Sequence, residues 1–310
     1  MRSANNPNLV TRGMILIIAT ALMISLQDLV FKLFKGDLTL WQIFALRGVM
    51  TVPLLALIGV IRARSLKTVR HACEVWPLIR GLCLTMTFLA FYAAIPFLSL
   101  STVGAANYIA PIFVAILSAF VIKEAVGAWG WIGVFLGFVG VVVLLQPGTD
   151  AFSPFALLPI LGAAFYSVGL IITRTKCQSY SVESLALSLN AMMMFAGFAL
   201  TFVLVLAPLS QPLVAQNPYL LGNWNTVALS DWLALAALTG FAILIGVMHA
   251  GAYQIAPPAT VATFEYSYLV FVAAWDILFF ETLPTATTIL GMVLIVGAGL
   301  LVMQGKPKSS

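Results

Sequence analysis

The chain has 310 residues, of which 62% are hydrophobic and only 8% are charged, and its formal net charge is +5. Because a soluble domain carries roughly 25% charged residues, this composition excludes an ordinary water-soluble globular protein and indicates a chain surrounded by lipid. The positive net charge does not indicate a nucleic-acid partner. Most Lys and Arg residues lie in short segments between long apolar runs, where such residues determine the orientation of a membrane protein.

Ten apolar runs are long enough to cross a bilayer, which requires roughly 20 mostly apolar residues in a helix. Dividing the chain at charged residues, Pro, Gly and Asn predicts transmembrane helices over residues 13–34, 39–60, 76–96, 102–122, 128–146, 154–173, 182–207, 231–254, 258–280 and 284–303. The first run exceeds the length of a signal-peptide core, so we expect an uncleaved helix. One long connection, 208–230, is rich in Pro, Gln and Asn, and we expect a short interfacial element there.

The basic residues are distributed asymmetrically over this arrangement. If the N-terminus is cytoplasmic, twelve of the fifteen Lys and Arg residues lie on the cytoplasmic side, whereas Lys32 and Lys35 lie on the outer side and Arg47 lies within the second helix. Positive residues accumulate on the cytoplasmic side of membrane proteins. We therefore predict a multi-pass protein of the cytoplasmic, or inner, membrane with both termini in the cytoplasm, which requires an even number of spans.

The two halves of the chain contain a similar segment. In each half an apolar helix closes on a glutamate, Glu124 or Glu281, and a short turn leads to a helix with a Gly-x-x-Leu motif. The two glutamates are 157 residues apart, which is half the length of the chain. Small residues follow at Gly140 and Ala298, and such residues let helices pack closely in lipid.

This similarity indicates an internal duplication, with one five-helix repeat over residues 1–150 and a second over residues 151–310. Because five is an odd number, the second repeat enters the membrane inverted relative to the first. Inverted repeats are typical of secondary transporters, in which the substrate site lies at the interface between the repeats. The predicted fold is therefore all-α and integral to the membrane, with ten transmembrane helices as two inverted five-helix repeats.

Several motifs along the predicted helices resemble those of a known transporter family. They are Ala106 to Pro111 with Phe113 and Glu124, Gly133 to Leu136 with Gly140 and Val141, Ala256-Pro257, Phe264-Glu265-Tyr266, Glu281, and Gly291 to Leu294. Through them the chain resembles the EamA branch of the drug/metabolite transporter superfamily over nearly its whole length. The resemblance implies a ten-helix secondary transporter of amino acids, amines, vitamins such as riboflavin, or other metabolites, without a cofactor. Asp276 departs from the family pattern, which usually has Gly or another small residue there.

Ionisable side chains within hydrocarbon are costly and are therefore functional candidates. Asp28 and Arg47 lie about 9 and 12 Å from the outer ends of their helices, at about 1.5 Å per residue, so the two can form a pair. Lys32 lies one helical turn after Asp28. These residues either form a charged cluster that binds a zwitterion or relays a proton, or form a structural ion pair from which Lys32 extends to the membrane surface.

Glu265 and His249 form a second candidate pair. They lie about 10 and 8 Å from the cytoplasmic ends of two helices that follow each other in sequence. A carboxylate beside an imidazole within the membrane suits proton coupling, because both groups can bind and release a proton. A hydrogen-bonded structural pair is the alternative.

Neutral polar and aromatic residues form the remaining candidates. Aromatic faces with a few polar groups suit the wall of a pocket for a planar or cationic substrate. The candidates are Tyr92, Asn107, Tyr108, Tyr166, Asn190 and Tyr266. Each can instead serve helix packing, and tyrosines also mark the membrane interface.

Motifs for other classes of function are absent from the sequence. There is no GxSxG, HExxH or P-loop segment, so we expect neither an enzyme nor an ATP-driven pump. Cys73, Cys83 and Cys177 have neither disulfide-framework nor metal-site spacing, so we expect no metal site. No repeated filter segment indicates a channel.

We predict a secondary active transporter of a small organic metabolite, such as an amino acid or an amine, that works by alternating access with protons as a candidate coupling ion. A riboflavin-like vitamin carrier of the same fold is the alternative, and a membrane channel or an integral membrane enzyme is the alternative from another class. The expected partners are the lipid bilayer and the small-molecule substrate, with no nucleic acid, and the chain is expected to act as a monomer or a homodimer.

Overall fold

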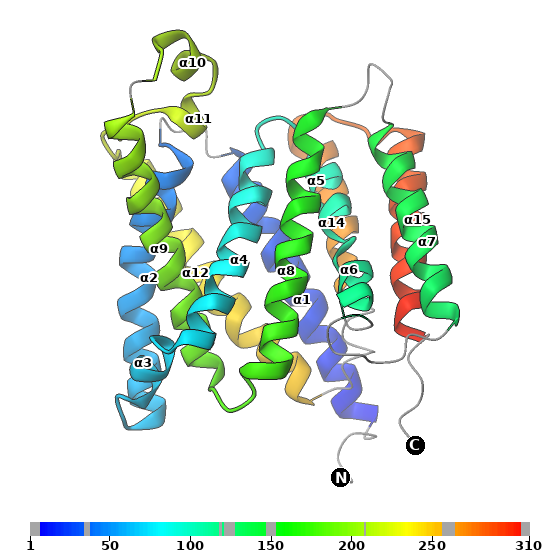
Figure 1. Ribbon diagram of the computed structural model, residues 1–310, viewed down its shortest axis with the longest axis horizontal. Helices are drawn as coiled ribbons and strands as arrows, with labels where there is room; N and C mark the ends of the chain where they lie inside the picture. Colours follow the sequence, from blue (N-terminus) through cyan, green and yellow to red (C-terminus); the bar gives the residue numbers. More distant parts are fainter. Residues whose placement is uncertain are drawn as a thin grey trace. The chain divides into compact units, whose positions relative to one another are not determined.

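The computed structural model describes residues 7–33, 38–117, 120, 128–146, 153–207, 209–255 and 264–304 (Figure 1). Within these ranges every regular element is a helix. Seven of the described helices are long and apolar enough to cross a membrane, and three further apolar helices are shorter. The prediction of an all-helical, multi-pass membrane protein is therefore confirmed at this level, and ten spans stay a prediction.

Most predicted spans correspond to helices in the described ranges. These helices are α1 (Pro7–Leu33), α2 (Leu40–Ala63), α4 (Val75–Ala94), α7 (Ala128–Leu145), α8 (Leu157–Lys176, preceded by the 3-10 turn η2, Pro154–Ala156), α9 (Val182–Leu206), α12 (Leu229–Ile255), α14 (Ser267–Phe280) and α15 (Ala286–Gln304). The short helices α10 (Gln211–Gln216) and α11 (Pro218–Leu221) provide the element expected in the 208–230 connection. One short helix, α3 (Lys67–Ala72), was not predicted.

The prediction of one continuous helix over 102–122 is wrong. The structure instead has α5 (Leu100–Asn107) and α6 (Ala110–Leu117), with a turn at Tyr108 and Ile109 between them. Asn107 precedes this turn and Pro111 follows it, and a proline removes a backbone donor from a helix, but the surrounding apolar run led to the prediction of a continuous helix.

A similar interruption lies in the second half of the chain. Residues 264 and 265 are helical, Tyr266 forms a turn, and α14 starts at the next residue. The earlier part of the predicted helix 258–280, up to residue 263, lies outside the described residues.

Side-chain caps set the beginnings of several helices. The hydroxyls of Thr39, Ser99 and Ser181 each accept a hydrogen bond, at 3.2 Å, from the backbone N–H three residues further on, which satisfies a donor that the first turn leaves unpaired. Glu281 follows α14 in the left-handed conformation with φ 52°. This confirms that the helix closes on that glutamate, whereas Glu124 lies outside the described residues.

Residue contacts divide the chain into two compact units. Unit 1 comprises Met1–Leu29, Thr87–Ile171 and Val247–Ser310, and unit 2 comprises Val30–Met86 and Ile172–Gly246. The divisions fall within α1, α4, α8 and α12. Each unit therefore draws on both halves of the sequence, and the repeats over 1–150 and 151–310 stay a prediction.

Within unit 1, α7 and α15 pack side by side in opposite directions (Figure 1). An added Cβ at Gly140 would lie 3.0 Å from side-chain atoms of Leu294 and Ile295, and one at Gly291 would lie 2.9 Å from Leu144. Residue numbers thus rise along one helix as they fall along the other. Close packing through small residues, as expected from Gly140, is confirmed.

The helices α5 and α14 also run antiparallel within unit 1, and a buried carboxylate joins them. Asp276 of α14 is fully buried and accepts hydrogen bonds from the backbone N–H groups of Leu100, at 3.0 Å, and Ser101, at 2.7 Å. These two N–H groups begin α5 and have no partner within their own helix. The residue that departs from the family pattern therefore has a structural role as a helix cap.

Within unit 2, α2 and α9 form a third antiparallel pair. An added Cβ at Gly48 would lie 2.4 Å from Met194, and one at Gly197 would lie 2.6 Å from the backbone nitrogen of Ala45 and the backbone oxygen of Trp41. Glycine on each helix thus lets the other approach to backbone contact.

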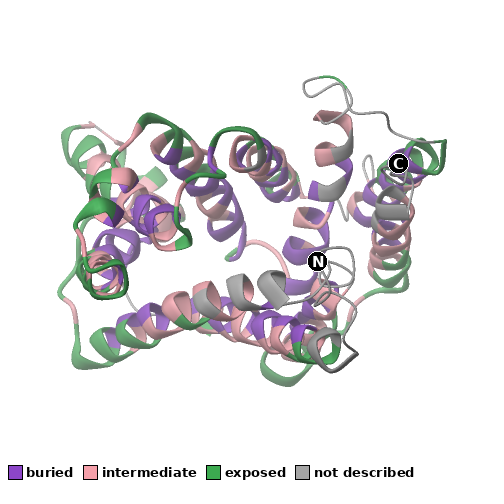
Figure 2. Ribbon diagram, turned by 90° about the horizontal axis from the view of Figure 1, so that it is seen from below, coloured by how far each residue is buried: buried purple, intermediate pink, exposed green. Residues whose placement is uncertain are grey.

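Large apolar side chains are exposed on many described helices. Phe135, Phe195 and Val293 are examples, and Figure 2 shows helices with buried residues on one side and exposed residues on the other. Water would oppose so much exposed apolar surface, whereas hydrocarbon accommodates it. The exposed side chains therefore agree with a membrane setting.

Candidate functional site

A buried carboxylate of α1 is held by two tyrosine hydroxyls in unit 1. Asp28 is only 2% exposed. Its Oδ1 accepts a hydrogen bond from the hydroxyl of Tyr92 of α4 at 3.0 Å, and its Oδ2 accepts one from Tyr268 of α14 at 2.7 Å. The side-chain amide of Gln27 donates to the Tyr92 hydroxyl at 2.8 Å. Hydroxyl donors on both oxygens fix the orientation of the carboxyl group.

Two further tyrosine rings continue the site from Tyr268. The ring centre of Tyr108 lies 5.6 Å from that of Tyr268 and 5.3 Å from that of Tyr266. Tyr108 stands at the turn between α5 and α6, and Tyr266 stands at the turn before α14. The two interruptions therefore bring aromatic faces together, and such faces attract cations.

The hydroxyl of Tyr108 links the two interruptions directly. It donates a hydrogen bond to the backbone carbonyl of Glu265 at 3.0 Å. This hydrogen bond joins the turn between α5 and α6 to the residue just before the turn that precedes α14.

The side chain of Glu265 contacts His249 of α12. The Nε2 of His249 lies 3.1 Å from Oε1 of Glu265, and the two side chains are 41% and 27% exposed. The predicted contact between them is confirmed, and its part in proton coupling stays a prediction. Both groups are open enough for proton exchange, unlike Asp28.

Two buried polar atoms beside Tyr108 lack a partner among the described residues. They are Oδ1 of Asn107 and the hydroxyl of Tyr266. A buried polar atom without a hydrogen bond costs about 1–3 kcal/mol, so native structures rarely leave one unsatisfied. Both atoms are therefore suited to bind a polar group of a ligand.

We call these residues the tyrosine–carboxylate cluster: Asp28, Tyr92, Asn107, Tyr108, His249, Glu265, Tyr266 and Tyr268. All but Tyr268 were predicted from the sequence as candidates. Tyr268 and the neighbouring Gln27 were missed, because their contacts with Asp28 and Tyr92 depend on how separate helices pack.

The other candidates lie elsewhere. Arg47 belongs to unit 2, where it is buried, donates to Sδ of Met193 at 3.2 Å and lies 5.7 Å from the ring centre of Phe44. Asn190, also in unit 2, donates to the carbonyl of Ala186 in its own helix. Arg47 and Asp28 are in different units, so the predicted pair between them stays a prediction. The same holds for a role of Tyr166, a half-buried residue of α8.

The cluster does not resemble a metal site. Across the described ranges, no group of three or more His, Cys, Asp or Glu residues is placed to hold a metal ion. Its carboxylates contact hydroxyl and imidazole groups instead, and the chemistry offered is recognition of a cation or a planar ring.

The first half of the chain matches a known transporter family. Residues 11–146 match the model of the EamA-like transporter family. The resemblance to EamA proteins is confirmed. This match covers α1 to α7 and includes Asp28, Tyr92 and Tyr108 of the cluster.

Several relatives are named as transporters. The chain is 25% identical to a Rickettsia prowazekii protein named S-adenosylmethionine uptake transporter, over 86% of this chain and 82% of the relative. It is 26% identical to a Vibrio cholerae protein named riboflavin transporter, over 86% and 82% of the two chains. The relatives are transporters by name, in agreement with the prediction that the chain is not an enzyme.

A solved structure has the same fold. It is described as "Crystal structure of protein", is 17% identical and superimposes with a TM-score of 0.57 over 96% of each chain. At this identity the likeness concerns the fold alone.

Proposed function

We propose that this chain is a secondary active transporter that moves a small organic metabolite across the cytoplasmic membrane by alternating access. The match to the EamA-like family, the transporter relatives and the membrane-length helices support this function. In the proposed topology ten spans form two inverted five-helix repeats and both termini are cytoplasmic.

The antiparallel helix pairs support the inverted repeats. In the predicted numbering of spans, α2 and α9 are the second and seventh, α5 and α14 belong to the fourth and ninth, and α7 and α15 are the fifth and tenth. Each pair joins counterparts from the two halves, and each pair packs antiparallel within one unit. Counterpart helices in an inverted duplication run in opposite directions.

The observation that carries the proposal is the meeting of two interrupted helices at Tyr108 and Glu265. Broken helices within a membrane protein leave backbone groups and side chains available to a substrate, and transporters build their sites there. Around this contact lie aromatic faces, the buried carboxylate of Asp28 and the unpartnered hydroxyl of Tyr266, and Asn107, with its unpartnered Oδ1, directly precedes Tyr108 in the chain.

This chemistry favours a substrate with a positively charged group. Tyrosine faces attract cations and a carboxylate neutralises them, which agrees with the predicted amino acid or amine class. S-adenosylmethionine, named for the Rickettsia relative, carries a sulfonium, an amine and a planar base, and is the first compound to test. A riboflavin-like substrate is the alternative, because tyrosine rings also stack on a planar ring system and a Vibrio relative is named for that vitamin.

Protons are the proposed coupling ion, and Glu265 with His249 is the proposed coupling pair. The two side chains are in contact and partly exposed, so either can exchange a proton with water. Asp28, buried and hydrogen-bonded, is assigned to the substrate instead.

The test of the function is flux in proteoliposomes that contain the purified full chain. Labelled S-adenosylmethionine, riboflavin, amino acids and polyamines are offered singly, with protein-free liposomes as the control. We expect saturable counterflow of at least one cationic compound and no ion current of the size a channel gives. Folded protein that exchanges none of these compounds, or that conducts without saturation, would contradict the proposal.

A further inference from the structure

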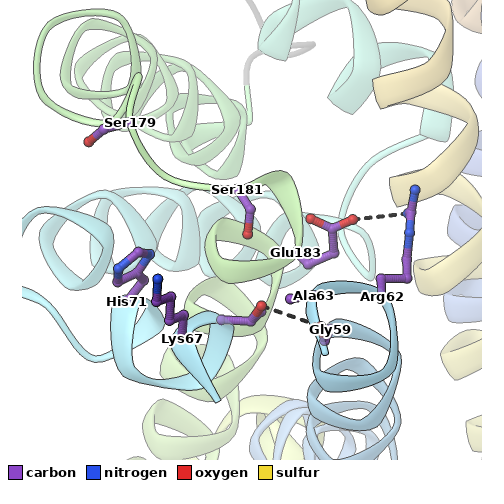
Figure 3. Close-up of a pocket in the computed structure, with 9 residues that line it drawn as sticks. Gly59, Arg62, Ala63, Lys67, His71, Ser179, Ser181 and Glu183 are labelled. Atoms are coloured by element: carbon purple, nitrogen blue, oxygen red, sulfur yellow. Dashed lines mark hydrogen bonds and ion pairs between the residues drawn. The ribbon is translucent and has the colours of Figure 1, made fainter. Parts of the chain in front are cut away.

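Unit 2 has a hollow where α3 folds back against the ends of α2 and α9 (Figure 3). Its volume is about 370 Å³. The lining residues are Gly59, Arg62, Ala63, Lys67, Thr68, His71, Ser179, Ser181 and Glu183. An added Cβ at Gly59 would lie 2.6 Å from the Thr68 side chain, so glycine allows the close contact that closes the base of the hollow.

Positive charge predominates on the lining. Arg62 and Lys67 are cationic, and Glu183 is the carboxylate in the lining. Glu183 pairs with Arg62 at 2.9 Å, and the Arg62 side chain is 66% exposed, so the guanidinium keeps donors open to a second acceptor. Lys67 and His71 are four residues apart on α3 and share one helix face, as Figure 3 shows on the opposite wall.

The surroundings of the hollow are apolar and exposed. Leu66, in the turn that leads into α3, is 72% exposed, and Val75, Trp76 and Val182 are also exposed. The Nζ of Lys176 lies 5.1 Å from the ring centre of Trp76. Tryptophan and lysine with apolar neighbours are typical of the depth of lipid headgroups. The hollow therefore lies at the end of two membrane-length helices, where headgroups are present.

Exposed apolar residues also lie along α2, on the side of the helix away from Gly59 and Ala63. Leu54, Leu57 and Ile61 are exposed and lie three and four residues apart, so they follow one face of the helix. These exposed residues indicate that the part of α2 next to the hollow is surrounded by lipid, which favours a lipid headgroup over a soluble anion as the ligand.

We propose that this hollow binds the phosphate group of an anionic phospholipid headgroup. Arg62 and Lys67 donate to the phosphate oxygens, and Glu183 limits the affinity by competing for Arg62. Basic pockets between membrane helices bind anionic headgroups in this manner. The proposal depends on the membrane setting and is independent of the transported substrate.

The test is a titration of the purified full chain in detergent with phosphatidylglycerol that has eight-carbon acyl chains. Thermal unfolding is followed, because a ligand that binds only the folded state raises the unfolding midpoint. The same titration with eight-carbon phosphatidylcholine and with inorganic phosphate compares a neutral lipid and a free anion. We expect the anionic lipid to act at lower concentration than either.

Four variants locate the site. Lys67→Gln is expected to weaken the apparent affinity for phosphatidylglycerol about tenfold, as loss of a hydrogen bond from a charged donor does, whereas Lys67→Arg retains it. Glu183→Gln is expected to strengthen binding, a gain that a folding defect does not produce. Arg70→Gln, an exposed residue of α3 that does not line the hollow, is the matched control and should leave the affinity within about twofold.

Three results would overturn the proposal. The first is an equal response to phosphatidylglycerol and phosphatidylcholine. The second is equal weakening by Lys67→Gln and Arg70→Gln, which would indicate general surface charge. The third is binding of inorganic phosphate as tight as that of the anionic lipid, which would indicate a site for a soluble anion.

Discussion

The hydroxyl of Tyr108 donates a hydrogen bond, at 3.0 Å, to the backbone carbonyl of Glu265, a residue 157 positions later in the chain. The same interval separates Glu124 from Glu281, the two glutamates that mark the proposed repeats. In the proposed repeats, Tyr108 and Glu265 therefore occupy equivalent positions, and each stands at or beside the interruption of its helix. A substrate bound at this contact would touch both repeats.

Tyr108→Phe is expected to lower stability and transport together. The variant keeps the aromatic face but leaves the Glu265 carbonyl without this donor, a loss of about 1 kcal/mol in the free energy of unfolding. Thermal unfolding and counterflow are measured on the same preparation. Tyr180→Phe is the control, because it removes the 2.6 Å hydrogen bond to Glu74 in unit 2 and should leave counterflow unchanged. Equal effects of the two variants on counterflow would contradict a role of Tyr108 in the site.

Glu265→Gln is expected to abolish proton-driven accumulation of the substrate while counterflow of the substrate continues. Without an ionisable carboxyl beside His249, a proton gradient should no longer drive accumulation, while counterflow, which needs no net proton movement, continues. Uptake driven by an imposed pH difference is compared with counterflow, and Glu74→Gln serves as the control. If Glu265→Gln accumulates substrate with unchanged pH dependence, this carboxyl is not the coupling group.

Gly197→Ala and Gly240→Ala are expected to change stability in opposite directions. A Cβ at Gly197 would lie 2.6 Å from backbone atoms of α2, whereas none of the described atoms lies within 4 Å of a Cβ at Gly240 of α12. Overpacking at the first position should destabilise the protein by about 1–3 kcal/mol. Better helix propensity at the second should stabilise it by up to about 1 kcal/mol. The midpoints of thermal unfolding test both, and a neutral Gly197→Ala would show that α2 and α9 are less closely packed than described.

Much of the fold could be predicted because hydropathy reports directly on membrane helices. The starts and ends of α2, α7 and α9 lie within a few residues of the predictions. The turn at Tyr108 was missed because the prediction followed hydropathy; Asn107 and Pro111, which flank the turn, were the signals of a helix break. The short helix α3 was missed because its six residues are too few and too polar for the hydropathy pattern.

The charged members of the candidate site were predicted from their chemistry, most of the neutral members were named as pocket candidates, and Tyr268 was missed. Ionisable residues are costly in hydrocarbon, so those within apolar runs were chosen as candidates. This reasoning identified Asp28, Glu265 and His249. The contact of Asp28 with Tyr268 spans 240 positions and depends on how α1 meets α14. No local pattern in the sequence encodes that approach, so the tyrosine was overlooked.

The most direct test of the central claim is counterflow by Asp28→Asn beside the unaltered chain, in proteoliposomes loaded with S-adenosylmethionine or with the cationic compound that gives the largest flux. Asparagine keeps the size of the side chain but removes the charge that the cluster offers to a cation. At equal amounts of folded protein, we expect the initial rate to fall about tenfold or more, as loss of one buried charge interaction does. An unchanged rate in Asp28→Asn would contradict the assignment of the tyrosine–carboxylate cluster as the substrate site.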